Sequence, residues 1–118
     1  MTSLEKAKNI VKILDGKKAE DIAVIETKEV TVVSDYFVVA GGTSNTHVRA
    51  LANEVEDGMK QLGVEPDHIE GRATGWILLD YGNVLVHVFD PQSREYYNIE
   101  RLWNDAARVD ISDIVTEN

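Results

Sequence analysis

The stretch of this 118-residue chain best suited to binding a phosphate is Gly41-Gly42-Thr43-Ser44. It lies between a predicted strand and a predicted helix N-terminus, where free amide groups and the helix dipole favour an anion. The lysine of a Walker loop is absent, and the dinucleotide-binding fingerprint is not met. A glycine pair is also a common way to make a turn. Phosphate binding and a purely structural turn therefore both stay open.

A glycine pair followed by Thr-Ser at a helix start is also the layout of nucleotidyltransferases, which hold two metal ions on paired carboxylates of a following strand. Here the candidate carboxylates, Asp110 and Asp113, lie in the C-terminal tail instead. The histidines His47, His68 and His87 fall on separate predicted elements and share no ligand spacing. The sequence therefore predicts no metal, no cofactor and no catalytic residue. A small nucleotidyltransferase-like or phosphate-binding enzyme is the alternative.

Two predicted strands joined through Gly82-Asn83 carry the side chains best suited to bind a partner. The dipeptide suits a tight turn because both residues tolerate positive φ. If the turn holds two residues, one face of the hairpin is apolar throughout and consists of Ile77, Leu79, Tyr81, Val84, Val86 and Val88. The opposite face is mixed and consists of Trp76, Leu78, Asp80, Leu85, His87 and Phe89, because successive strand side chains point to opposite sides.

The mixed face combines a carboxylate, an imidazole and two large aromatic rings. Aromatic anchors among polar groups are typical of protein-binding surfaces. The other interpretation is a second core face whose two polar groups are satisfied internally. The sequence leaves these two interpretations open.

Composition predicts a compact domain without covalent cross-links. Apolar residues make up 43% of the chain, and it contains no cysteine, which fits a reducing compartment. No apolar run approaches membrane-spanning length and the N-terminus has no signal core, so we expect a cytoplasmic protein. The formal net charge is −9, from 21 acidic and 12 basic residues. This charge opposes binding to a nucleic-acid backbone and favours a basic protein partner.

Periodicity predicts an α+β or mixed α/β fold, with helices packed on a single mixed sheet in the order α-β-β-α-β-β-β-α. Thr2 and Glu5 have capping-box spacing at the start of a first helix that ends at Gly16. Strands are expected over 22–26 and 35–40. The second of these is apolar on both faces, so we expect it to be central.

A long helix is expected to start after Thr43 or Ser44 and to end at Gly63. Its predicted buried stripe consists of Val48, Leu51, Ala52, Val55, Met59 and Leu62. A short strand over 68–70 precedes the hairpin, and Pro91 opens a last helical segment that continues to residue 103. Residues 1–105 form the predicted domain. Residues 106–118 form an acidic tail that is either partly disordered or loosely docked.

Several segments, taken in order, resemble the Iojap family of ribosomal silencing factors (RsfS). They are Asp35–Ala40, the Gly-Thr-Ser turn, His47–Ala52, Glu70-Gly71, Trp76–Gly82, Val86–Phe89 and Tyr97–Trp103. Each segment is weak alone, but the ordered set is specific and extends over about residues 3 to 105.

The resemblance implies an adaptor without catalysis, on a fold similar to nucleotidyltransferases but lacking their metal-binding carboxylates. Members of the family bind ribosomal protein L-fourteen of the large ribosomal subunit, at the surface that faces the small subunit. They thereby prevent subunit joining and lower translation. The alternative assembly is a homodimer that pairs through the hairpin face.

At matching positions, the resemblance assigns the contact role to Trp76, Leu78, Asp80, Leu85 and His87. Trp76 would be the buried anchor, and Asp80 would pair with a lysine or arginine of the partner. Tyr81, Arg94 and Tyr97 are further candidates for the contact. The parity of the strand nevertheless puts Tyr81 on the core face, unless the turn is longer than two residues.

Overall fold

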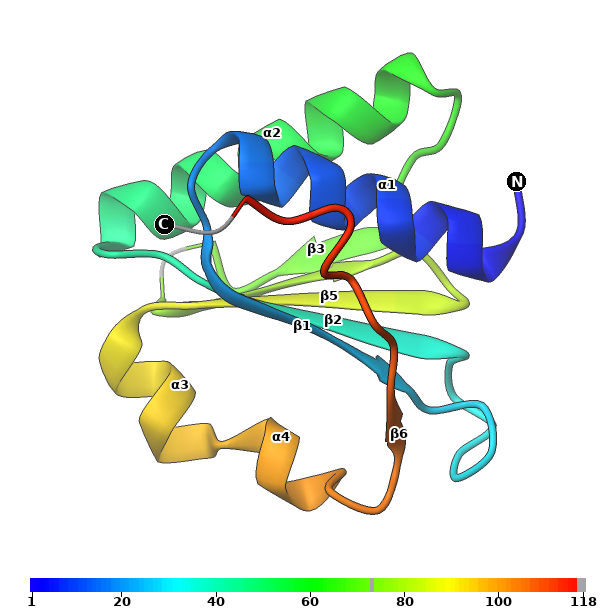
Figure 1. The fold of residues 1–118 in the computed structure, drawn as a ribbon. Helices are drawn as coiled ribbons and strands as arrows, with labels where there is room; N and C mark the ends of the chain where they lie inside the picture. Colours follow the sequence, from blue (N-terminus) through cyan, green and yellow to red (C-terminus); the bar gives the residue numbers. More distant parts are fainter. Residues whose placement is uncertain (73, 117–118) are drawn as a thin grey trace.

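A single six-stranded sheet forms the middle layer of the protein, with helices on both sides (Figure 1). The computed structural model describes residues 1–72 and 74–116. In chain order the elements are α1 (Ser3–Gly16), β1 (Glu20–Glu26), β2 (Tyr36–Gly41), α2 (Asn45–Gln61), β3 (His68–Glu70), β4 (Trp76–Asp80), β5 (Val84–Phe89), α3 (Pro91–Tyr97), α4 (Ile99–Leu102) and β6 (Ala107–Arg108). The predicted mixed α+β fold is confirmed.

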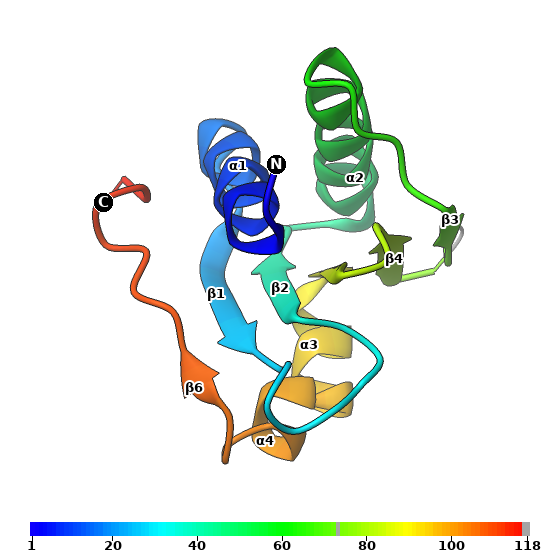
Figure 2. The same cartoon turned by 90° about the vertical axis from the view of Figure 1, so that its right-hand side faces the viewer.

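The strand order is β3-β4-β5-β2-β1-β6. Strands β2 and β5 are parallel, whereas all other neighbours are antiparallel. Helices α1 and α2 cover one face of the sheet, and α3 and α4 lie against the other (Figure 2). All six residues of β2 are buried because the strand is central and both of its faces are covered. The prediction of a central strand here is confirmed.

The two long helices begin as the sequence predicts. In α1, the backbone N–H of Glu5 donates to the Thr2 hydroxyl at 3.1 Å, and the Glu5 carboxylate accepts from the Thr2 N–H at 2.9 Å. In α2, the cap is Ser44, whose hydroxyl accepts from the His47 N–H at 3.2 Å. No helix in the described part of the chain is long and apolar enough to cross a bilayer.

The predicted buried stripe of α2 is confirmed from Val48 to Met59 but is wrong at Leu62, which is half-exposed. The helix ends at Gln61, so Leu62 no longer follows the helical spacing that would turn it toward the sheet. Gly63 then leaves the helix with φ +81°, a conformation that glycine adopts without steric cost.

The last helical segment is divided in two at Asn98. The sequence analysis expected one segment from Pro91 to residue 103, but Asn98 adopts a left-handed conformation (φ 42°, ψ 55°) between α3 and α4. Asparagine tolerates this region better than most residues, so it can end one helix and start another. The change of direction lets Ile99 and Trp103 pack on the sheet, where both contribute to the second core.

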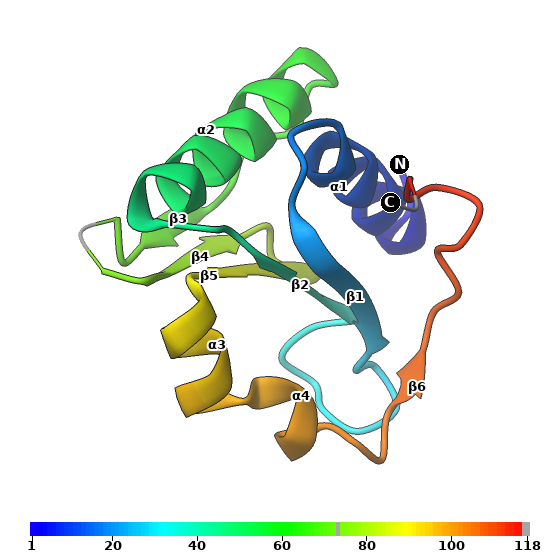
Figure 3. The same ribbon diagram turned by 60° about the vertical axis from the view of Figure 1, so that its left-hand side comes forward.

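The acidic tail, which the sequence separates from residues 1–105, adds a sixth strand to the sheet. In β6, Ala107 and Arg108 pair with the outer edge of β1. The chain then runs back toward α1 (Figure 3), where Ile111 is 9% exposed and belongs to the main core. The Thr116 N–H and hydroxyl donate to the Asp15 carboxylate, each at 2.9 Å. Residues 117 and 118 lie outside the described residues.

We expect the substitution Ile111→Ala to lower the free energy of unfolding by about 2 kcal/mol, because it removes buried apolar contacts and leaves a cavity. Denaturant titration should show this loss. The exposed residue Leu102 provides the control, because Leu102→Ala removes similar volume from a side chain that is 75% exposed. Equal stability of Ile111→Ala and the wild type would show that the tail is not docked in solution.

Candidate protein-binding surface

The hairpin of β4 and β5 has the predicted register. Ile77 faces Val88 and Leu79 faces Val86, and the Tyr81 N–H donates to the Val84 carbonyl at 3.0 Å. The apolar face of the hairpin is buried beneath α1 and α2. The mixed face therefore lies on the opposite side of the sheet, toward α3 and α4.

On that side, aromatic rings of four elements pack together. Trp76 of β4 lies 4.6 Å from the Tyr97 ring of α3 and 5.1 Å from the Phe89 ring of β5, measured between centroids. Phe37 of β2 lies 4.8 Å from His87 and 5.3 Å from Trp103. We call this group the aromatic cluster, and it consists of Phe37, Trp76, His87, Phe89, Tyr97 and Trp103. It joins α3 and α4 to the sheet.

The mixed face is divided into a buried part, which is a second core, and a part that stays partly exposed, for which protein binding remains a prediction. Phe89 and His87 are buried and belong to a second core with the residues beneath α3 and α4. Trp76, Leu78, Asp80 and Leu85 remain partly exposed. The helices cover β2 and most of β5 but leave Leu85 and the same face of β4 partly accessible. A continuous strip along the hairpin is therefore free to contact another molecule, and we call it the open face.

Tyr97 of α3 borders the open face. Tyr97 is 47% exposed although its ring packs on Trp76. Tyr96 and Leu102 are exposed further still, at 82% and 75%. The sequence analysis did not select Tyr96 or Leu102. The sequence signal for Tyr96 was its position next to Tyr97, and the helix that carries both tyrosines has no buried residue.

His87 is held as a neutral imidazole inside this cluster. Its Nδ1 accepts a hydrogen bond from the Trp76 indole N–H at 3.1 Å, so the proton of the neutral ring resides on Nε2. Nε2 is buried and has no hydrogen-bond partner among the described residues. Burial lowers the pKa of His87 from its ordinary value of 6.5 to about 4. His87 thus orients Trp76 from below, and its own surface contributes little to contact.

Asp80 is the carboxylate of the open face, and its position is fixed from two sides. One of its oxygens accepts the Gly82 N–H at 2.7 Å, which closes the turn of the hairpin. The other lies 3.4 Å from His68 Nε2 on the neighbouring strand β3. The carboxylate remains partly exposed, so it can also reach a cation outside the molecule.

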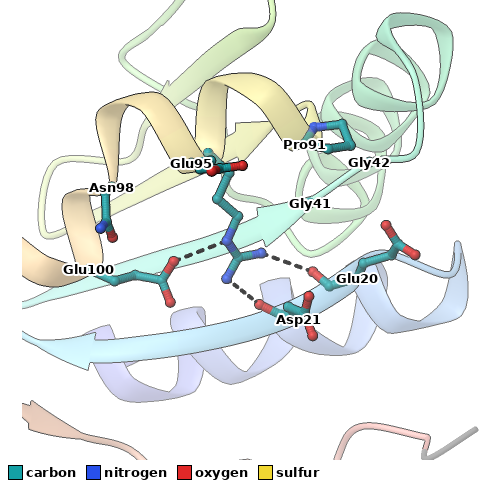
Figure 4. A pocket seen from close by; sticks show the side chains of 9 residues that line it. Glu20, Asp21, Gly41, Gly42, Pro91, Glu95, Asn98 and Glu100 are labelled. Atoms are coloured by element: carbon teal, nitrogen blue, oxygen red, sulfur yellow. Dashed lines mark hydrogen bonds and ion pairs between the residues drawn. The ribbon is translucent and has the colours of Figure 1, made fainter.

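Two sequence candidates do not lie on the open face. Tyr81 is buried on the opposite side of the sheet, as strand parity required, and burial raises the pKa of its hydroxyl. Arg94 links α3 to α4 and β1: its Nε donates to the Glu100 carboxylate at 3.0 Å, and its terminal nitrogens donate to the backbone carbonyls of Glu20 and Asp21 (Figure 4). This network is satisfied internally, so Arg94 has a structural role.

The cavity beside Arg94 has a volume of about 400 Å³ and is mostly acidic (Figure 4). Its lining includes Glu20, Asp21, Glu95 and Glu100, together with the backbone of Gly41 and Gly42. The guanidinium of Arg94 already faces carbonyl and carboxylate oxygens. The cavity therefore offers little positive potential to a phosphate.

The turn from Gly41 to Ser44 is occupied by internal contacts. The Thr43 N–H donates to His47 Nδ1 at 2.9 Å, so His47 Nε2 carries the proton and donates to the Lys17 carbonyl at 3.0 Å. A Cβ on Gly42 would stand only 2.8 Å from the Val48 side chain, which requires glycine here for close packing. The N–H groups of Gly42 and Thr43 are thus already bonded, Gly42 to the Phe89 carbonyl at 2.8 Å, and this favours a structural role for the turn.

The three histidines stay apart, as their positions in the sequence indicate. His47 belongs to the first turn of α2, His68 to the edge strand and His87 to the aromatic cluster. Within the described residues, no group of three or more His, Cys, Asp or Glu side chains is arranged to hold a metal ion. Asp110 of the tail accepts the Ser112 N–H at 2.9 Å and is part of a local turn.

The protein is a small α+β domain in which one sheet face is half covered by aromatic packing and has a carboxylate at its border. The family described as "Ribosomal silencing factor during starvation" matches residues 1–118. The chain belongs to this family, as the resemblance of its ordered segments predicted.

Three relatives illustrate the match. The ribosomal silencing factor RsfS of Halalkalibacterium halodurans is 34% identical over 117 residues, which cover 98% of this chain and 100% of that protein. The mouse protein named "Mitochondrial assembly of ribosomal large subunit protein 1" is 35% identical over 98 residues, covering 80% of this chain and 43% of the mouse protein. A crystal structure of a Chromobacterium violaceum protein superposes with a TM-score of 0.86 at 39% identity, covering 88% of each chain.

We expect the stability of the protein to fall as the pH decreases from about 6.5 toward 4. The unfolded chain binds a proton on His87 in this window whereas the folded protein does not, so acid favours unfolding. The difference in pKa corresponds to a loss on the order of 3 kcal/mol. Denaturant midpoints measured along this pH range would reveal it.

His87→Phe is the matched variant, because it fills the site without a titrating group. Its stability should depend less on pH than that of the wild type, while the carboxylates titrate equally in both. An NMR titration of the folded wild type in which His87 protonates near pH 6.5 would contradict the prediction.

Proposed function

We propose that this protein binds ribosomal protein L-fourteen on the large ribosomal subunit through the open face, and that it thereby blocks association with the small subunit. Translation is repressed because the bound protein occupies space at the subunit interface. The family supports a role in silencing ribosomes. The name of the mouse relative supports the large subunit as the partner.

The observation that carries the proposal is the partly exposed Trp76. Its ring is held by Phe89, Tyr97 and the hydrogen bond to His87, so it loses little conformational freedom on binding. Preorganised tryptophan residues at the centre of an apolar strip are frequent hot spots of protein interfaces. Leu78, Leu85 and Tyr97 extend the contact around it.

Charge supports a basic protein as the partner. The net charge of −9 repels the phosphates of ribosomal RNA and attracts a basic protein surface. Asp80 brings a carboxylate to the border of the open face, where a lysine or arginine of the partner can reach it. Charge of this kind increases the association rate and selects among partners more than it increases affinity.

Occlusion requires no chemistry, and we propose that the protein is not an enzyme. In the turn at Gly41 to Ser44 the N–H groups of Gly42 and Thr43 are bonded internally, and among the described residues no group of three or more carboxylates or histidines is arranged to hold a metal ion. Inhibition of subunit joining should therefore follow the occupancy of the large subunit without any added nucleotide. Sedimentation of the purified protein with isolated large subunits, and not with small ones, is the first test.

Trp76→Ala should weaken binding to the large subunit by roughly 2 kcal/mol or more, because truncation of a buried anchor removes its contacts. Cosedimentation at a series of large-subunit concentrations measures the change. Leu62→Ala is the control, since Leu62 is also exposed but lies at the end of α2, on the other side of the sheet. Circular dichroism must show that both variants are folded. Unchanged binding by folded Trp76→Ala would remove Trp76 from the contact.

Asp80→Asn and Asp80→Lys separate the charge of this residue from its role in the turn. Asparagine keeps an oxygen that can accept the Gly82 N–H, so we expect an intact hairpin and moderately slower association. Lysine places a like charge against a basic partner, and association should be much weaker. Added salt should weaken wild-type binding through screening. Stronger binding at higher salt would show that the contact is mainly apolar and that Asp80 has no charge partner.

A further inference from the structure

The loop between β1 and β2 presents apolar side chains that the fold does not use. Val30, Val32 and Val33 are 49%, 104% and 67% exposed, and none of them belongs to either core. Neighbouring exposed apolar residues on a protein surface commonly mark an interaction site. We call residues 28–34 the valine loop.

The base of the valine loop is ordered by buried polar contacts. The Thr27 hydroxyl donates to the Ser34 carbonyl at 3.0 Å, and both residues are buried. The Thr27 N–H donates to the Asp35 carbonyl at 2.8 Å, and the Thr31 N–H donates to the Thr27 carbonyl at 2.9 Å. Valine side chains have few rotamers. The tip is thus presented in a preorganised form, which reduces the entropy lost on binding.

The valine loop borders the open face. The N–H groups of Asp35 and Tyr36 donate to the Asn83 carbonyl at 2.8 and 3.2 Å, which ties the loop to the turn of the hairpin. From there the loop bends toward the side of the sheet that α3 and α4 occupy (Figures 1 and 2). Leu85 of the open face lies next to Phe37, two residues beyond Asp35. A protein that covers Leu85 would therefore meet the loop as well.

The charges on and around the valine loop favour a basic protein as its binding partner. The only cation of the loop, Lys28, lies 3.9 Å from the Glu26 carboxylate and 5.8 Å from the centre of the Tyr36 ring. Glu29 remains exposed beside the valines. An anionic membrane would repel a chain of net charge −9. The cavities of about 600 and 400 Å³ on this protein are lined mainly by charged and hydroxyl side chains, so a second copy offers poor pockets for valine.

We infer that the valine loop is a second contact of the same docking surface, and that its tip inserts into an apolar pocket of the basic protein that receives Trp76. This inference rests on the proposed function. The loop and the open face then hold the partner at two points, so that its orientation as well as its position is fixed.

The test compares Val32→Ser combined with Val33→Ser against the wild type, using cosedimentation with isolated large subunits. Binding should be about tenfold weaker, because two apolar contacts are lost. The thermal midpoint should stay unchanged, because both side chains are exposed. Val32→Ile combined with Val33→Ile should bind nearly as well as the wild type. Leu62→Ser is the control for loss of an exposed apolar residue elsewhere.

The binding of the serine, isoleucine and Trp76 variants separates the inference from the proposed function. Weaker binding by the serine variant, with its salt dependence unchanged and the isoleucine variant active, supports an apolar contact. If Trp76→Ala weakens binding but the serine variant does not, the inference fails and the proposed function stands. If neither variant weakens binding, both fail. Self-association of the free wild type that the serine variant abolishes, measured by sedimentation at several concentrations, would identify a second copy as the occupant and overturn the inference.

Discussion

The parallel pairing of β2 with β5 is the constraint on which the rest of the structure depends. Parallel strands at the centre of a sheet need cover on both faces. Helices α1 and α2 cover one face of this pair. The other face must be covered by the chain that follows β5, and α3, α4 and Trp103 provide this cover. These elements are short, and they leave Leu85 of β5 and the same face of β4 partly exposed.

The hydrogen bond between Trp76 and His87 joins the part of the sheet face that is buried to the part that stays exposed. His87 is buried with Phe37 and Phe89, whereas Trp76 is partly exposed. The imidazole lies among aromatic rings of the second core and provides an acceptor for the indole N–H. The polar pair therefore fixes the direction of the indole ring, while the buried Nε2 of His87 has no hydrogen-bond partner among the described residues. This arrangement joins the buried part of the sheet face to its partly exposed part.

A protein that acts by occlusion needs a well-oriented surface and no reactive centre. The polar groups most suggestive of chemistry in the sequence are all used for structure. His47 of α2 bonds to Thr43 in the turn before the helix, and Arg94 joins α3 to α4 and β1. The valine loop and Trp76 share one feature, because each presents apolar side chains on an ordered support. A hydrogen bond holds the base of the loop, and Phe89, Tyr97 and His87 hold the Trp76 ring.

Local sequence alone determined much of this protein. The capping box at Thr2, the cap at Ser44, the buried β2 and the register of the hairpin follow from spacing and turn chemistry, which act over a few residues. The register of the hairpin predicts that one of its faces carries Trp76, Leu78, Asp80, Leu85 and His87. Tertiary structure decided how that face is divided, because the break at Asn98 sets where α3 and α4 lie. It also added β6 and the buried Ile111 from a weakly patterned tail, since pairing with β1 depends on a distant edge that local patterning does not encode.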